Sequence, residues 1–510
     1  MDAMLFFGAL GALYLMLLFF DNFFKSCMHY PYMEFLKKTG ITVHFMHLRW
    51  HTIAFNRTML RCGNNGNSRN LLIKFFTVGV LFALSLLPIG LILLIFAIFS
   101  GNNDSKAGDV VGSGGGSQTV TVEILLPGVN LPLEEIGFYV TTLLLSTIVH
   151  ELGHALAAVA EDVQVLGFGL HLYFCLPMAY TEVSNEQLNA LKWFKKLRIL
   201  CGGIWHNFLF AGICYLLFST LGLMTAPLYT LNKNVMVTEV LHNSPLRTKG
   251  GVGLSAGNII THINNCEVRN EDTWFNCLAK SLRIKPGYCV SSDFIRLNDE
   301  SIEISHHGPD GMLQCCDDKN ANLCCFEYVD DLSNDAPVEI PQHVCLDVRR
   351  TIDESYDYCV AGNCDRGFCI RPLLRNTTTI LNIKRTTMEH KKLPDVNYMG
   401  HPADVTRSVR ISSFVPKQKY VGSYWGDAYS LFLKYNVVFS FGLALVNAIP
   451  CFGFDGYHIT STIINSFLVN RVTERPKRDV ISLIVTSIGT LLFSLAVLKV
   501  LWLSVLQKLF

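Results

Sequence analysis

The sequence has little charge. Only 16% of its 510 residues are Asp, Glu, Lys or Arg, against about 25% in an average soluble domain. The charges nearly cancel, with 42 basic and 41 acidic residues. Without a basic excess the chain cannot bind nucleic acid through counterion release, so no direct nucleic-acid partner is expected. Half of the residues are hydrophobic, which argues against disorder and indicates that membrane spans occupy much of the chain.

Long hydrophobic runs are plentiful. A helix needs about 20 mostly apolar residues to cross the bilayer core. Six segments meet this requirement: 1–20, 75–100, 137–160, 197–224, 428–450 and 480–510. The first lacks the basic residues and the cleavage site of a removable signal peptide, which predicts a retained anchor. The apolar stretch 163–180 is too short to span as a helix, so we expect re-entrant or strand-like structure there.

The expected fold class is therefore a polytopic α-helical membrane protein with about six transmembrane helices. The large polar region 232–426 is long enough to have its own core, and short Ile/Val runs separated by Gly253 and Gly257 predict small strands in it. The other expected parts are an anchor at 1–20, a polar loop at 21–74, spans at 75–100, a Gly/Ser-rich linker and loop at 101–136, membrane-core parts at 137–231 and 427–470, and a C-terminal transmembrane helix at 471–510.

Cysteines are concentrated in the large polar region. Eleven of the 17 lie between Cys266 and Cys369. No pair of C-x2-C motifs occurs there, so disulfides in an oxidising lumen are favoured over a structural zinc site. An odd number leaves one thiol over, or one paired elsewhere. Glycosylation sequons at Asn56, Asn103 and Asn376 agree with lumenal exposure.

The segment 21–70 gives conflicting signals about its side of the membrane. It has seven basic residues and only two acidic ones, which by the positive-inside rule favours the cytosol. The sequon at Asn56 favours the lumen. We expect a lumenal position, and the cytosolic alternative stays open.

The span 137–160 contains the motif H-E-x-x-H, formed by His150, Glu151 and His154. Positions i and i+4 share one face of a helix, so both imidazoles can bind one Zn²⁺ at about 2.0–2.1 Å. A water on zinc ionises near neutral pH, and Glu151 can act as its general base. Chance would produce this pattern about 0.02 times in such a chain. Ionisable groups inside a span are costly, which favours a functional site.

A catalytic zinc site needs a third protein ligand. Asp455 lies in the apolar segment 447–459 and is followed by glycine. Alone it would be interpreted as a turn residue, but the unpaired H-E-x-x-H motif favours a ligand, with His458 as the alternative. Pro450 should end the preceding helix. The freed backbone and the Asn447 amide can then hold an unwound substrate.

Another span contains the sequence CGGIWHNF, residues 201–208. Gly202 and Gly203 allow a neighbouring helix to approach closely. His206 and Asn207 can bind the substrate backbone or hydrogen-bond to a metal ligand. A polar contact between helices without a catalytic role is the alternative.

These motifs together resemble the site-2 protease family of membrane-embedded zinc metalloproteases, and its animal members most closely. The resemblance rests on H-E-x-x-H at 150–154, GIWHN at 203–207, the glycine-punctuated segment from Ser244 onward and Asp455-Gly456. It covers about residues 137–470 and implies a PDZ-like domain in the polar region. Bacterial relatives have N-x-P-D-G, whereas Pro450 here stands five residues before Asp455.

The resemblance implies one catalytic zinc ion and a specific class of partner. Such enzymes cut transmembrane helices of membrane-bound transcription factors after a first protease has removed the lumenal part. The implied substrates are sterol regulatory element-binding proteins and stress-responsive leucine-zipper factors, whose cytosolic halves then reach the nucleus. The implied location is the Golgi membrane, with the endoplasmic reticulum as the alternative. No obligate protein partner is predicted.

Two other functions fit some of the same residues. One is an inactive membrane scaffold whose PDZ-like region binds peptides. The other is a zinc transporter or channel. The protease hypothesis predicts that Glu151→Gln keeps the metal and loses cleavage, because Glu151 exchanges protons and does not bind the metal. Asp455→Asn should weaken zinc binding as well as cleavage, because Asp455 is a ligand.

Overall fold

The computed structural model describes residues 3–63, 66–99, 133–247, 253–283, 285, 287–303, 305–307, 313–317, 322–329, 343–359, 364–375, 377–418 and 420–509. The chain forms two compact units, Met1–Ser219 with Leu431–Phe510, and Thr220–Ser430. Most of the expected linker at 101–136 and the sequons at Asn103 and Asn376 lie outside the described residues.

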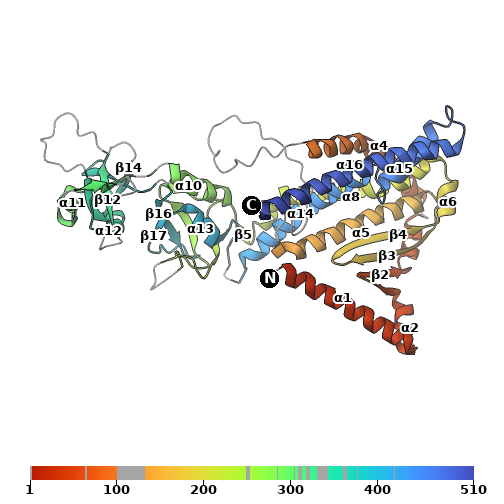
Figure 1. Cartoon of the computed structure of the whole chain (residues 1–510), viewed down its shortest axis with the longest axis horizontal. Coiled ribbons are helices and arrows are strands. Elements are labelled where there is room, and N and C mark those ends of the chain that lie inside the picture. The colour runs from red at the N-terminus through yellow and green to blue at the C-terminus, as the bar shows by residue number, and fades with distance from the viewer. Residues whose placement is uncertain are drawn as a thin grey trace. The chain divides into compact units, whose positions relative to one another are not determined.

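The first unit is mostly helical (Figure 1). Its helices are α1 Ala3–Ser26, α2 Tyr30–Thr39, α3 Asn56–Gly63, α4 Gly66–Phe99, the 3-10 turn η1 Leu133–Glu135, α5 Ile136–Ala160, α6 Asn185–Ala190, α7 Trp193–Leu200, α8 Gly202–Ser219, α14 Ser423–Ala448, α15 Asp455–Phe467 and α16 Arg475–Leu509. Within the described ranges, six helices (α1, α4, α5, α8, α14 and α16) are long and apolar enough to span a membrane. The prediction of a multi-pass membrane protein is confirmed.

The prediction of one continuous membrane-spanning helix over 197–224 is wrong. It divides into the end of α7, the helix α8 and the short α9 Leu221–Thr225. The break lies next to Gly202 and Gly203, because α7 ends at Leu200 and α8 begins at Gly202. Glycine is a poor helix former, which favours a break at this point. Gly202 also lies against Gly153 of α5, where an added Cβ would be 2.7 Å from the Gly153 carbonyl oxygen. The two helices approach closely because both positions lack a side chain.

The stretch 163–180 is strand-like. The strands β3 Val165–Tyr173 and β4 Leu176–Val183 form a hairpin in a four-stranded antiparallel sheet with the order β1-β2-β3-β4. The two other strands, β1 Ile41–His44 and β2 His47–Thr52, come from the segment expected to be a polar loop. That expectation is wrong, because β2 finds its backbone partners on the distant β3, from His47 opposite Tyr173 to Thr52 opposite Phe168.

The side chain of Asn56, in the sequon of this segment, contacts strand β3. The Asn56 Nδ2 donates a hydrogen bond to the Leu166 carbonyl at 2.8 Å, and its Oδ1 is buried. A glycosylated Nδ2 keeps one hydrogen and can still donate to Leu166, so this contact leaves the sequon as evidence for the lumen in place. The orientation of the segment stays a prediction, with the sequon and the basic residues as its two opposing signals.

The second unit is the β-rich insert between α8 and α14, and its described residues form two large sheets and two short two-stranded ones, β10-β11 and β5-β19. Its helices are α9, α10 Glu271–Arg283, α11 Ser292–Asn298, α12 Val348–Glu354 and α13 Pro402–Ser408. Its strands are β5 Tyr229–Thr230, β6 Val235–Val240, β7 Ile259–Ile263, β8 Cys266–Glu267, β9 Gly287–Val290, β10 His306–His307, β11 Leu313–Gln314, β12 Leu323–Tyr328, β13 His343–Asp347, β14 Asp357–Cys359, β15 Phe368–Pro372, β16 Thr379–Thr386, β17 Val396–Gly400, β18 Val409–Ser412 and β19 Val415–Pro416.

Each of the two large sheets has its own core. The six-stranded sheet, in the order β17-β16-β7-β6-β18 with β8 beside β7, packs around the buried Trp274 of α10. The five-stranded sheet, in the order β13-β12-β15-β9-β14, packs around Tyr288 and Phe326. The short strands expected after residue 235 are present as β6 to β8, with positive φ at Gly253 and Gly257.

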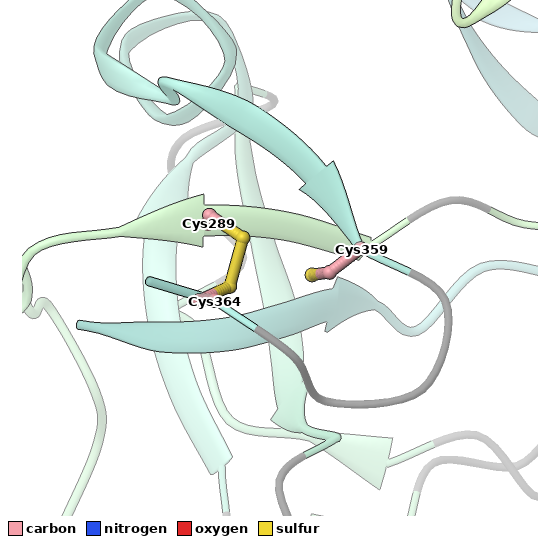
Figure 2. Close-up of side chains that lie close together, drawn as sticks. All are labelled: Cys289, Cys359 and Cys364. Atoms are coloured by element: carbon pink, nitrogen blue, oxygen red, sulfur yellow. A yellow bond between two sulfur atoms is a disulfide. The ribbon is translucent and has the colours of Figure 1, made fainter. Parts of the chain in front are cut away.

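The cysteines of this insert form disulfides, as predicted. The five bonds are Cys266–Cys277, Cys289–Cys364, Cys315–Cys325, Cys316–Cys345 and Cys359–Cys369. Figure 2 shows Cys359 beside the Cys289–Cys364 bond. These clustered sulfurs are bonded in pairs, which speaks against the structural zinc alternative. The one thiol left over from the eleven is Cys324.

The leftover thiol should react slowly. Burial raises the pKa of Cys324 to about 11, and the thiolate is the reactive form. We expect iodoacetamide to modify Cys324 in the folded protein slowly at pH 7 and faster as the pH rises towards 11. Peptide mass spectrometry measures the extent of this modification. Cys324→Ser should leave thermal unfolding unchanged, whereas Cys289→Ser with Cys364→Ser should lose about 2–5 kcal/mol of stability. Fast labelling of Cys324 at pH 7 would contradict this assignment.

Candidate metal centre

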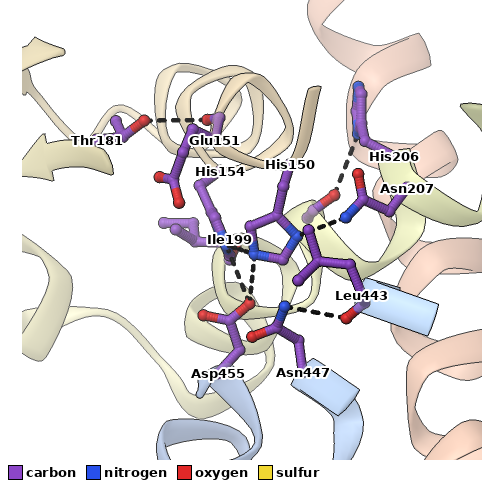
Figure 3. A network of polar contacts seen from close by, with 11 residues as sticks. His150, Glu151, His154, Thr181, Ile199, His206, Asn207, Leu443, Asn447 and Asp455 are labelled. Atoms are coloured by element: carbon purple, nitrogen blue, oxygen red, sulfur yellow. Dashed lines mark hydrogen bonds and ion pairs between the residues drawn. The ribbon is translucent and has the colours of Figure 1, made fainter. Parts of the chain in front are cut away.

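Three side chains from two distant segments meet in the membrane unit (Figure 3). His150 and His154 lie one turn apart on α5, and their Nε2 atoms are 3.2 Å apart. Asp455 is the first residue of α15, and its Oδ2 is 3.0 Å from His150 Nε2 and 3.1 Å from His154 Nε2. The two histidines and the acid singled out in the sequence are thus brought together at one point.

The chain reversal after α14 positions Asp455. Helix α14 ends at Ala448, just before Pro450. Gly453 has a φ of +87°, which favours glycine, and an added Cβ at Gly456 would be 2.0 Å from the Ile449 carbonyl oxygen. The two glycines let the chain fold back tightly, so that α15 begins with the carboxylate facing α5.

The spacing of the three ligand atoms fits zinc. A tetrahedral ion at 2.0–2.1 Å from each ligand keeps the ligand atoms about 3.3 Å apart. The observed separations of 3.0, 3.1 and 3.2 Å are close to this value. His458, the alternative ligand, is absent from the group and has its ring against Tyr457.

The second nitrogen of each imidazole has a partner suited to metal binding. The His154 Nδ1 lies 2.8 Å from the Ile199 carbonyl oxygen, which accepts a hydrogen bond from the Nδ1–H group. The His150 Nδ1 lies 3.1 Å from the side-chain amide of Asn207, whose Oδ1 is buried and unpartnered in the described part of the chain. If Nε2 binds metal, Nδ1 carries a proton and needs an acceptor. A 180° rotation of the amide places the orphaned Oδ1 there, so Asn207 fits a liganded His150.

Helix α8 leaves room for the two imidazoles at Gly203. An added Cβ at this position would be 2.5 Å from His154 Nε2 and 2.6 Å from His150 Nε2. Real Cβ atoms do not come this close to other heavy atoms. The two Nε2 atoms, which are the candidate metal ligands, therefore occupy space that a side chain at position 203 would fill.

Glu151 lies on the same turn of α5. Its carbonyl oxygen accepts a hydrogen bond of 3.1 Å from Thr181 Oγ1 of β4. Figure 3 shows its carboxylate next to His154, outside the set of three ligand candidates. This position suits a group that exchanges a proton beside the metal without binding it.

The other residues named from the sequence take different positions. The His206 ring stacks on Phe76, and its Nδ1 donates to the Gly202 carbonyl at 3.1 Å, so it points away from the ligand atoms. Asn447 is buried and donates to the Leu443 carbonyl of its own helix at 3.0 Å. Figure 3 places it beside Asp455. Pro450 shapes the reversal, where its carbonyl oxygen packs against Gly489.

Sequence reasoning missed two partners of the site. The Ile199 carbonyl is a backbone group, so the pattern of side chains in the sequence cannot indicate its role. Thr181 is an ordinary strand residue, and its role depends on the packing of β4 against α5. Gly203 was noticed as a small residue, but its contact with both histidines required the packed helices.

Comparison with known proteins gives an independent result. The profile of Peptidase family M50 matches residues 138–495. A protein of Arabidopsis thaliana, described as "Membrane-bound transcription factor site-2 protease homolog", is 23% identical over 424 residues, which cover 73% of this chain and 78% of that protein. The region matched by the family profile contains His150, His154 and Asp455.

Proposed function

The chain belongs to peptidase family M50, the site-2 protease family, and from this premise we propose that it is a zinc endopeptidase that cuts substrates inside the membrane. The meeting of His150, His154 and Asp455 at zinc-like spacing carries the proposal. When bound, zinc supplies a Lewis acid and a water that ionises near neutral pH. Glu151 would hold and transfer the proton of that water and of the leaving amine.

The substrate must unwind before it can react. A transmembrane helix has its carbonyls in internal hydrogen bonds, so a peptide bond is accessible only after local unwinding. Among the described strands β4 lies at the edge of its sheet and packs against α5 next to Glu151. Its edge can pair with an extended substrate segment. The Asn447 amide, beside Asp455 in Figure 3, is the nearest candidate from α14 to hold such a segment.

The proposed substrates are membrane-bound transcription factors of the sterol regulatory element-binding and stress-responsive leucine-zipper types, cut first on the lumenal side. The name of the Arabidopsis relative refers to a membrane-bound transcription factor, which supports this general class of substrate. The disulfide-rich insert supports a lumenal position for the second unit, because disulfides persist in oxidising compartments. We place the protein in the Golgi membrane and assign the six-stranded sheet with α10 and α13 as a PDZ-like domain.

Reconstitution tests this proposal. The purified full chain in proteoliposomes is given a transmembrane substrate either with its lumenal domain or trimmed to a short lumenal stub. We expect cleavage of the trimmed form alone, loss of cleavage after treatment with a zinc chelator, and recovery after zinc is added back. Binding of the trimmed substrate without cleavage would instead support the inactive scaffold. Zinc flux into the vesicles that survives Glu151→Gln would support a transporter.

A further inference from the structure

The second unit contains a cavity of about 590 Å³ that the proposed protease chemistry does not use. Its walls come from both sheets: β9 and β14 of the five-stranded sheet, and β16 and β17 of the six-stranded sheet. Helix α12 closes one side. Its volume lies within the range of small-molecule sites.

Two residues that line the cavity each have a buried polar atom without a partner among the described residues. The Tyr288 side chain is 1% exposed, and its hydroxyl makes no hydrogen bond within the described structure. Asn382 is 4% exposed, and its Oδ1 is equally unpartnered among those residues. Buried polar groups are nearly always satisfied, so the pair calls for a polar occupant.

The orientation of the Asn382 amide follows from its neighbours. Asp353 can only accept, and it takes a hydrogen bond of 3.3 Å from Asn397 Nδ2. The Asn397 Oδ1 therefore faces Asn382 and accepts from its Nδ2 at 2.8 Å. This chain of amides leaves the Asn382 Oδ1 as an acceptor on the cavity wall. Burial raises the pKa of Tyr288, so its hydroxyl keeps its proton and can donate.

The charged side chains of the lining disfavour an ionic occupant. The lining contains acidic and basic residues together: the acidic ones are Asp353, Asp357 and Asp395, and the basic ones are Arg349 and Lys384. A cation would meet the two basic groups, and an anion would meet the three carboxylates. An apolar occupant would leave the Tyr288 hydroxyl and the Asn382 oxygen unsatisfied. An uncharged ligand rich in hydrogen-bonding groups avoids each of these penalties.

The backbone beside the two unpartnered atoms disfavours an extended peptide. Strand β16 is paired on both sides, with β7 and β17, and β9 is paired with β15 and β14. Among the described strands, none has an open edge at Asn382 or Tyr288 for the main-chain ladder by which extended peptides bind, so recognition at these two residues must use side chains. The other two wall strands, β14 and β17, are the outer strands of their sheets, and the peptide probe described below tests main-chain pairing there.

We propose that the cavity is a binding site for a short uncharged carbohydrate. Each sugar hydroxyl both donates and accepts, so it can satisfy the Asn382 oxygen and the Tyr288 hydroxyl together. Tyr358 packs on Tyr288 with ring centroids 5.6 Å apart, and Tyr356 is half exposed. These rings offer flat apolar faces for the C–H side of a sugar ring, and Asp and Asn side chains bind pairs of hydroxyls.

The test uses the full chain in detergent and saturation-transfer NMR with three free methyl glycosides, of mannose, N-acetylglucosamine and galactose, at up to about 10 mM. Acetyl-trialanine methylamide, butylammonium and methyl phosphate serve as the peptide, cation and anion probes, and each carries protons that the NMR experiment can observe. Each is measured on intact protein and on protein from which N-glycans have been removed. We expect at least one glycoside to bind, and binding to weaken about tenfold or more in Tyr288→Phe, which removes one hydroxyl and keeps the ring.

Tyr328→Phe is the matched control, since Tyr328 lies on β12 of the same sheet and is not part of the cavity lining. It should bind as the wild type does. Binding only after N-glycan removal would identify the chain's own glycan as the occupant, and binding in both samples would show that the site is open to a carbohydrate from outside the chain. The proposal is overturned if no glycoside binds, if Tyr288→Phe binds as wild type, or if only the peptide or an ionic probe shows Tyr288-dependent binding.

Discussion

The Glu151→Gln variant is expected to keep one zinc ion per chain and to cleave its substrate at least about 10³-fold more slowly than the wild type. General acid–base catalysis contributes about 10²–10⁴-fold, and an amide cannot accept the proton that the carboxylate takes. His150, His154 and Asp455 remain in place as the ligand set. The measurement pairs substrate cleavage in proteoliposomes with zinc content by mass spectrometry.

Glu182→Gln is the matched control for Glu151→Gln. Glu182 follows Thr181 on β4, and its carboxylate is half exposed. The same loss of one negative charge near α5 should leave the cleavage rate within about twofold of the wild type, as exposed charges contribute little. Loss of zinc in Glu151→Gln would make Glu151 a ligand, and wild-type cleavage with zinc retained would remove it from catalysis.

Gly203→Ala should lose zinc although it adds only one methyl group. The new Cβ would be 2.5 Å from His154 Nε2 and 2.6 Å from His150 Nε2, so either the imidazoles or α8 must move. Displacement of groups that orient metal ligands costs about 10–100-fold in metal affinity. Because Gly203 contacts both histidines, we expect a loss of at least about 100-fold, with a matching loss of cleavage.

The control for Gly203→Ala lies on the same helix. At Gly212 an added Cβ meets no described atom within 4 Å. Both changes place alanine in α8 and alter helix propensity alike, so Gly212→Ala should bind zinc and cleave as the wild type does. A Gly203→Ala protein with full zinc content and normal cleavage would show that the two histidines do not meet a metal at α8.

The sequence alone determined the parts of this protein that depend on local pattern. Long apolar runs indicated six candidate spans, since the thickness of the bilayer sets their length. The i, i+4 spacing of His150 and His154 fixed a shared helix face before any packing was known. The concentration of cysteines in one polar region indicated disulfides. Their odd number left either a free thiol or a partner elsewhere in the chain, and the structure shows a free thiol at Cys324.

Other features were decided only by the tertiary structure, because they join residues far apart in the chain. The segment 21–74 looked like a loop until β2 found its hydrogen-bond partners on β3. The Ile199 carbonyl, the Gly203 clearance and the fold-back that brings Asp455 to α5 are contacts between helices, and hydropathy does not record them. The Tyr288 and Asn382 cavity likewise exists only where two sheets meet. Motifs and hydrophobic runs that involve neighbouring residues can be recognised in the sequence. The convergence of residues far apart in the chain depends on packing that no local pattern specifies.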